Sequence, residues 1–154
     1  MKIRQFESND LNSCCNLLIH VFNQEPWNDK WSNEGAEQYL LDYIHTPGFK
    51  GIVAEDENGL KGFIFGFRKR WWKADEFFIN EMCVNINEQR SGVGTKLIKY
   101  LESRLISEGV ENITLLTNRG IPAEEFYKKN GFNIVDRIIF LYKKLNNIAL
   151  KSGF

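Results

Sequence analysis

One short segment, Gln89–Ile98, constrains the fold of this chain more than any other. It follows an apolar run, 77–84, that is typical of a strand. It also opens a helical pattern in which the apolar residues recur on one face, at Val93, Leu97, Leu101 and Leu105. Gly92 and Gly94 at this turn leave backbone N–H groups uncovered at the positive end of the helix dipole. The segment therefore predicts a strand–turn–helix unit that binds a phosphate or pyrophosphate.

The spacing Gln/Arg-x-x-Gly-x-Gly differs from two better-known phosphate loops. A dinucleotide fingerprint needs a third glycine where Leu97 stands, and a Walker loop needs Gly-Lys-Ser/Thr after four spacer residues. An ordinary glycine turn that caps a surface helix is the alternative. Another informative segment is 118–132, which contains Phe126-Tyr127-Lys128-Lys129-Asn130-Gly131-Phe132.

Together the two segments resemble the GCN5-related N-acetyltransferases, the GNAT superfamily. The glycine turn is similar to the family's pyrophosphate loop, and segment 118–132 is similar to the part of the family that carries its Tyr-x-x-x-Gly-Phe signature. The resemblance runs from about Phe63 to Leu145. Residues before it match only in the order of their elements.

Periodicity and turn residues predict a single domain over 1–154, with about 146–154 as a loose tail. Predicted strands cover 2–6, 51–56, 60–70, 77–84, 113–117, 132–137 and 138–145, and predicted helices begin near 11, 32, 93 and 122. This order, β-α-α-β-β-β-α-β-α-β-β, predicts a mixed α/β fold. The resemblance implies the GNAT fold, a mostly antiparallel sheet with helices on both faces. Asn58-Gly59 favours a type I′ hairpin turn between two of the strands.

Charge and cysteine content limit the partners. Twenty basic residues balance twenty acidic ones, so no global field favours nucleic acid or an anionic membrane. Cys14, Cys15 and Cys83 are odd in number and lack metal-ligand spacing, which favours free thiols in a reducing compartment and no bound metal. No apolar run approaches about 18 residues. We expect a cytoplasmic protein, either a monomer or a homodimer.

The resemblance implies acetyl-CoA as the acyl donor. Backbone N–H groups of 90–95 would hold its pyrophosphate, and the residues assigned to this loop are Gln89, Arg90, Ser91, Gly92, Val93, Gly94 and Thr95. The end of the preceding strand, Cys83 and Val84, would pair its backbone with pantetheine. Asn118 would contact pantetheine from the end of its own strand. The Cys83 side chain itself is interpreted as packing, because it lies in an apolar strand without a nearby histidine in sequence.

Two residues are candidates for proton transfer. Tyr127, in the signature, is the proposed donor to the CoA thiolate, because a phenol with a pKa of about 10 stays protonated at neutral pH. Glu81 is the candidate base, either directly or through water. The alternatives are a half-buried aromatic for Tyr127, and for Glu81 either a residue that only holds a cationic substrate by charge or a structural carboxylate paired with Arg68 or Arg70. The polyamine-acetylating relatives carry two adjacent acids here, and Asn80 stands in place of the first, which weakens a polyamine substrate.

The acceptor site is predicted to include Trp27 and Trp31, with Asn80 and Glu81 from the strand. Aromatic faces and nearby acids favour a cationic amine. We therefore expect attack on acetyl-CoA in a ternary complex by a small, aminoglycoside-like amine. A protein or peptide amino terminus as acceptor and a non-catalytic acyl-CoA sensor stay open. A nucleic-acid binder built on 68–73 is disfavoured because that basic run lies in a strand connection of a neutral chain.

Overall fold

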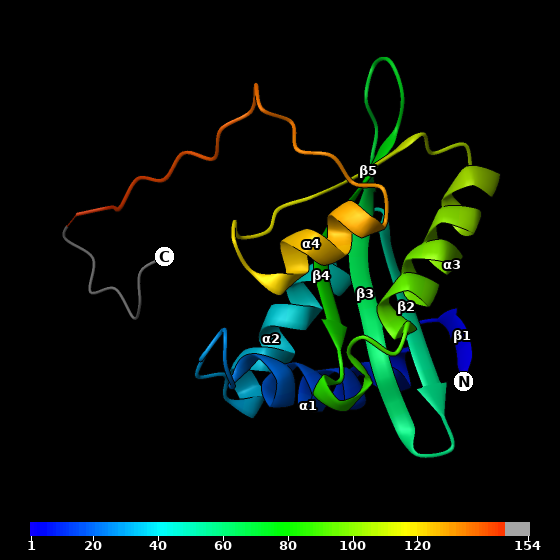
Figure 1. Cartoon of the computed structure of the whole chain (residues 1–154), viewed down its shortest axis with the longest axis vertical. Helices are drawn as coiled ribbons and strands as arrows, with labels where there is room; N and C mark the ends of the chain where they lie inside the picture. Colours follow the sequence, from blue (N-terminus) through cyan, green and yellow to red (C-terminus); the bar gives the residue numbers. More distant parts are fainter. Residues whose placement is uncertain (147–154) are drawn as a thin grey trace.

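A five-stranded sheet with helices on both faces forms the fold in the computed structural model, which describes residues 1–146 (Figure 1). The strand order is β1-β2-β3-β4-β5; the first four strands are antiparallel, and β5 is parallel to β4. The strands are β1 (Lys2–Gln5), β2 (Phe49–Asp56), β3 (Gly59–Lys69), β4 (Glu76–Val84) and β5 (Asn112–Leu115). The helices are α1 (Leu11–Phe22), α2 (Asn33–Ile44), α3 (Val93–Ser107) and α4 (Pro122–Lys129), with short 3-10 turns at Ser8–Asp10 and Ile86–Glu88. The mixed α/β architecture predicted from the sequence is confirmed.

Two apolar layers hold the helices on the sheet. On one face, Leu18 of α1 and Leu40 of α2 pack with Phe63 and Phe65 of β3, all fully buried. On the other face, the predicted apolar stripe of α3 is buried against the sheet and contacts residues such as Phe77. Each layer follows from the helical and strand periodicities of the sequence.

A β-bulge in β4 decides which way Glu81 points. Phe65 of β3 pairs with Glu81, but its neighbour Gly66 pairs with Ile79, so Asn80 is the extra residue of the bulged strand. Before the bulge, Ile79 belongs to the α3 layer; after it, Cys83 belongs to the α1–α2 layer. The bulge therefore turns Glu81 toward α1 and α2.

Only the first part of β4 is paired with β5. Their pairing covers Glu76–Ile79 of β4 and the whole of β5, and ends at Leu115. The second half of β4 has β3 as its only neighbour among the described strands. The two strands therefore open toward the C-terminal end of β4, next to the turn that leads into α3.

The predicted final pair of strands, 132–137 and 138–145, is wrong for this structure. These residues form no strand with any part of the described chain; they run outward from α4 as an extended segment (Figure 1). A strand requires a neighbour that completes its backbone hydrogen bonds, and this segment lies away from the sheet. A turn is present at the expected junction, where Ile138 N donates to Val135 O at 3.1 Å. The predicted tail, apart from Asn146, lies outside the described residues.

Glycines explain the turns of the fold, with one correction. Gly109 and Gly131, which end α3 and α4, have left-handed φ values of 77° and 88°. The β2–β3 hairpin forms, but only Gly59 there has a positive φ, 115°, whereas Asn58 does not. A type I′ turn needs positive φ at both central residues, so that expectation is wrong.

Candidate active site

A groove and a pocket meet where β4 separates from β5. The groove has a volume of about 1040 Å³ and lies between the end of β4, the start of α3 and α4. The pocket has a volume of about 300 Å³ and lies between β4, the end of β5 and the α1–α2 connection. The two share wall residues, which are Phe22, Trp27, Met82, Ala123 and Tyr127. A ligand in the groove and a ligand in the pocket would therefore touch the same side chains.

The start of α3 has the form expected of an anion-binding turn. Gly92 precedes the helix with a left-handed φ of 91°, and no side chain caps this end. The first helical hydrogen bond runs from Lys96 N to Gly92 O, 3.0 Å, so the N–H groups of 93–95 precede the helical ladder. These N–H groups and the helix dipole favour a phosphate there.

The predicted loop residues divide into two groups. Gln89, Arg90 and Gly94 line the groove. The other residues do not line it: Ser91 donates from its hydroxyl to Glu88 O, Gly92 and Thr95 lie in the turn and the first turn of α3, and the Val93 side chain is buried in the core. Their predicted contribution is limited to backbone N–H groups. Gly94 is needed for packing, because a Cβ there would lie 2.8 Å from the Phe126 ring.

Cys83 and Val84 line the groove, and their predicted pairing with pantetheine stays a prediction. The Cys83 side chain points into the α1–α2 layer, where its Sγ lies 3.8 Å from Leu17 O. Burial raises the pKa of the Cys83 thiol well above its ordinary value, so the thiol stays protonated. This environment supports the interpretation that the Cys83 side chain packs in the core and takes no part in catalysis.

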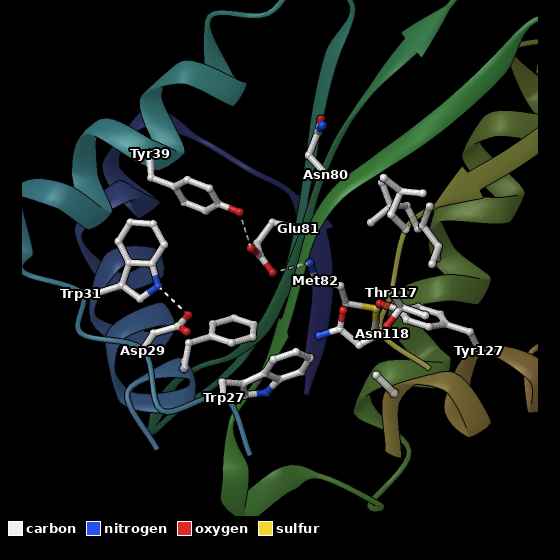
Figure 2. Close-up of a pocket in the computed structure, with 15 residues that line it drawn as sticks. Trp27, Asp29, Trp31, Tyr39, Asn80, Glu81, Met82, Thr117, Asn118 and Tyr127 are labelled. Atoms are coloured by element: carbon white, nitrogen blue, oxygen red, sulfur yellow. Dashed lines mark hydrogen bonds between the residues drawn. The ribbon is translucent and has the colours of Figure 1, made fainter. Parts of the chain in front are cut away.

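Glu81 is a half-buried residue whose carboxylate has defined partners (Figure 2). Tyr39 OH donates to its Oε2 at 2.7 Å, and Met82 N donates to its Oε1 at 3.1 Å. Burial raises the pKa of Glu81 to about 7, against the opposing effect of these two hydrogen bonds. A carboxyl with this pKa changes protonation state near neutrality, as a general base must.

The alternative ion pair for Glu81 is not formed. Arg68 Nη2 lies 2.7 Å from Asp75 Oδ2, and Arg70 Nη1 lies 3.9 Å from the same oxygen. Both arginines thus neighbour Asp75 in the β3–β4 connection. Glu81 is held by a phenol and a backbone N–H instead.

Tyr39 is a site residue that the sequence reasoning missed. It lies on the inward face of α2, and its ring is 4.7 Å from that of Trp31. Tyr43, one turn later, donates from its hydroxyl to Tyr39 OH at 3.2 Å. Sequence reasoning gave neither tyrosine a role in the site. The sequence did contain one signal for a polar site here, two tyrosines at i and i+4 on the same helix face, because a buried phenol needs a polar partner.

The pocket combines aromatic walls with negative charge. Trp27 and Trp31, the residues predicted for the acceptor site, both line it, and Trp31 Nε1 donates to Asp29 Oδ2 at 3.0 Å (Figure 2). Asp29 and Glu81 supply carboxylates, and no lysine or arginine is among the described residues that line the pocket. This composition attracts a cation.

The two predicted asparagines both line the pocket. Asn80, the bulge residue, has a buried Oδ1 without a hydrogen-bond partner in the described chain, and Figure 2 shows its amide directed away from Glu81. Asn118 lies on the opposite wall, after β5. It does not line the groove, so its predicted contact with pantetheine stays a prediction.

Tyr127 lines both the groove and the pocket. It lies on α4, with its ring centroid 5.2 Å from that of Phe126 and 5.5 Å from that of Phe132. Burial raises the pKa of the phenol further above its ordinary value, so Tyr127 is protonated at neutral pH. It can therefore donate a proton where the two cavities join.

Two further features concern metal binding and membrane insertion. No group of three or more histidine, cysteine, aspartate or glutamate side chains in 1–146 could hold a metal ion. In the same part of the chain, no helix is long and apolar enough to cross a membrane.

Residues 11–132 match the model of the acetyltransferase (GNAT) family. The match spans most of the chain and includes the groove, the pocket and the Gly92–Gly94 turn. The protein therefore belongs to the GNAT acetyltransferase family, as the two sequence segments suggested. No curated protein matches the chain.

Solved structures with the same fold confirm the architecture. An aminoglycoside acetyltransferase from an uncultured soil metagenomic sample, solved with trehalose, has a TM-score of 0.72 at 22% identity and covers 94% of this chain and 95% of its own. The same enzyme was also solved with sisomicin. A possible acetyltransferase from Clostridium difficile 630 has a TM-score of 0.77 at 15% identity, covering 94% and 97% of the two chains. A transcriptional regulator from Bacillus halodurans C-125 has a TM-score of 0.74 at 16% identity, covering 92% and 99%.

Proposed function

We propose that the protein transfers an acetyl group from acetyl-CoA to a primary amine of a small cationic molecule. The observation that carries this proposal is the position of two candidate proton-transfer groups, one in the pocket and one where the pocket joins the groove. Glu81, with a pKa of about 7, lines the pocket, and protonated Tyr127 lines both cavities. Membership of the GNAT family supports acetyl-CoA as the donor.

The groove has the features that bind the donor. Its phosphate end would be the start of α3, with the N–H groups of 93–95 and the Arg90 side chain. The half of β4 without β5 beside it offers backbone groups at Cys83 and Val84 to the amides of pantetheine. Bound in this way, the thioester would lie beside Met82, which lines both cavities.

The chemistry follows from the two titrating groups. Glu81, as the carboxylate, takes a proton from the ammonium, directly or through a water, and the free amine attacks the thioester carbonyl. A C–N bond forms, the nitrogen loses its second proton to solvent, and the C–S bond breaks. Tyr127 donates its proton to the departing sulfur, and solvent restores both side chains to their starting states.

The acceptor class follows from the walls of the pocket. Asp29 and Glu81 attract an ammonium, and the rings of Trp27 and Trp31 offer apolar and π faces to it. The unpaired Oδ1 of Asn80 can accept a hydrogen bond from a further donor on the acceptor. The volume of about 300 Å³ fits an amine with one ring of a larger molecule. An aminoglycoside-like amine satisfies all of these features, and the sisomicin complex of a structural neighbour supports this choice.

We place the reaction in the cytoplasm. Cys14, Cys15 and Cys83 are all free and buried in the described structure, as expected of a protein kept in a reducing compartment.

A panel of amines with acetyl-CoA, followed by release of free thiol, tests the proposal. We expect turnover with polycationic amino sugars and much less with neutral amino acids. Tyr127→Phe should lower kcat by about tenfold to a hundredfold or more, at unchanged affinity for acetyl-CoA. Tyr100→Phe is the matched control, because Tyr100 lies on α3 and lines neither cavity. A Tyr127→Phe enzyme with the rate of the control would remove Tyr127 as the acid.

A further inference from the structure

Two tryptophans outside the core and the cavities lie in the connection between β3 and β4. Residues 69–73, here called the β3–β4 tip, are all exposed, and each of them is a lysine, an arginine or a tryptophan. Trp71 is 59% and Trp72 is 85% accessible, although tryptophan is on average a highly buried residue type. Trp27 and Trp31, by contrast, are half-buried and line the pocket. The exposed pair therefore indicates a contact with something outside the chain.

The β3–β4 tip is held at its base and projects from the sheet. Arg68 N donates to Gly48 O at 3.0 Å, which ties the end of β3 to the segment before β2. On the other side, Glu111 N donates to Asp75 O at 3.1 Å. Asp75 Oδ1 also accepts a hydrogen bond from Trp71 N at 3.4 Å. Figure 1 shows the connection extending beyond the strands, at the end of the sheet opposite the β2–β3 turn. The tip therefore presents its side chains on a fixed projection.

The β3–β4 tip is positively charged, although the chain as a whole is neutral. Lys69, Arg70 and Lys73 supply three positive charges, and the Arg70 side chain is 87% exposed. The next acids along the chain are Asp75 and Glu76. Asp75 is already paired at the base of the tip, and Glu76 lies opposite Lys69 in the β3–β4 ladder. The outer part of the tip is thus two indoles with a basic side chain on each side.

We propose that the β3–β4 tip docks the protein on the surface of an anionic lipid bilayer. Tryptophan is favoured at the boundary between water and the acyl chains, because its ring is apolar and its N–H is polar. Lysine and arginine gain from the negative surface potential of anionic lipids. Residues 69–73 combine both requirements at the end of a projection. None of them lines the groove or the pocket, so docking uses no residue of either cavity.

A single-stranded nucleic acid is the other polyanion that indoles and basic side chains bind. Such binding uses a positively charged groove that follows the backbone over several nucleotides, with bases stacked along it. The β3–β4 tip is a projection, and its residues do not line the groove described above. A bilayer surface therefore fits the tip better than a nucleic-acid strand.

Co-sedimentation of the intact protein with lipid vesicles tests the charge of the tip. We expect saturable binding to phosphatidylcholine vesicles that contain about one-third phosphatidylserine, and binding weaker by about tenfold or more without it. Each basic side chain at an anionic surface raises affinity by about fivefold. Lys73→Glu, which replaces a positive charge with a negative one, should therefore weaken binding by about tenfold or more. Lys99→Glu is the matched control, because it makes the same change at another exposed lysine, on α3.

Replacement of both indoles tests the apolar contact. The emission of the unmodified protein should shift to shorter wavelength on vesicle binding, as indoles leave water. The double variant Trp71→Ala, Trp72→Ala should lose this shift and bind vesicles about tenfold or more weakly. Both side chains are exposed, and the hydrogen bond from Trp71 to Asp75 uses the backbone N–H. Circular dichroism should therefore show that the double variant stays folded.

Three results would overturn the proposal. The first is no binding of the unmodified protein to the anionic vesicles, and the second is equal binding to phosphatidylcholine alone. The third is binding that Lys73→Glu and the double tryptophan variant leave unchanged. Tighter binding of a single-stranded oligonucleotide, lost in the same variants, would also overturn it and make a nucleic acid the partner. Acetyl transfer without vesicles should be the same in all these variants, so a failure here leaves the proposed function standing.

Discussion

Removing the hydroxyl of Tyr39 tests most sharply how the site sets the pKa of Glu81, the proposed base. Tyr39→Phe removes one oxygen, the donor of the 2.7 Å hydrogen bond to Glu81 Oε2, and leaves the ring that packs on Trp31. A hydrogen bond to a charged group contributes roughly 1.5–3 kcal/mol. Since one pKa unit corresponds to about 1.4 kcal/mol, its loss should raise the pKa of Glu81 from about 7 by about one to two units.

The direction in which Tyr39→Phe changes the rate follows from the ionisation of Glu81. Only the ionised carboxylate can accept the proton, so kcat/KM falls as the pH drops through the pKa of Glu81. In Tyr39→Phe this acid limb should move to higher pH, and at pH 7 the ionised fraction should fall by about fivefold or more. A merely structural role for Tyr39 would lower the rate equally at every pH.

The assay is the pH dependence of kcat/KM with saturating acetyl-CoA and a good amine acceptor. Tyr43→Phe is the graded control: it removes the hydroxyl that donates to Tyr39 but keeps the bond to Glu81, so its acid limb should move less. An acid limb in Tyr39→Phe at the same pH as in the unmodified enzyme would refute the assignment of Glu81 as the titrating base.

Two further predictions concern the donor loop and stability. Gly92→Asp should weaken acetyl-CoA binding by at least about tenfold relative to Gly92→Asn. The asparagine has the same size and would occupy the same left-handed backbone position, φ 91°, but carries no charge. Equal affinities in calorimetry would show that the turn does not face a phosphate. Glu81→Gln should remove a pH dependence of stability: because the folded-state pKa of Glu81 is raised from 4.5 to about 7, ionisation costs the unmodified protein roughly 3 kcal/mol as the pH rises through this window. Urea unfolding at pH 5 and pH 8 should therefore show a larger loss for the unmodified protein than for Glu81→Gln, and equal losses would mean that the carboxyl is not buried as described.

The turn and the helices that we propose for donor binding were predictable from sequence because they depend on local chemistry. The glycines that surround α3 and the residues of α4 specify a turn, a cap and a helix face within a few residues of one another. The groove residues Gln89, Arg90 and Gly94 lie where the pattern indicated. Tyr127 likewise faces the cavities from the helix that its signature predicts.

The acceptor side depended on a feature that periodicity does not reveal. Without the bulge at Asn80, alternation would place Glu81 on the α3 face with Phe77 and Ile79. The extra residue reverses this and brings Glu81 to Tyr39, which is 42 positions away in the chain. The contact between a helix and a bulged strand is a tertiary property, so the local pattern around Tyr39 did not reveal it.

The C-terminal strands were predicted from a correct pattern and a wrong assumption about partners. Residues 132–145 have strand-like composition and a turn at the expected place. Composition does not say which edge completes the backbone hydrogen bonds. Residues 132–145 therefore have a strand-like sequence but form no strand in the described part of the chain.

The most direct test of the central claim is acetyl-CoA binding by calorimetry, followed in the same sample by free thiol release with the amine panel. Our account predicts saturable binding to one site per chain and thiol release that depends on a cationic amine. Binding without turnover for any amine would contradict the proposed transferase and leave an acyl-CoA-binding module. Absence of binding would contradict the assignment of the groove itself.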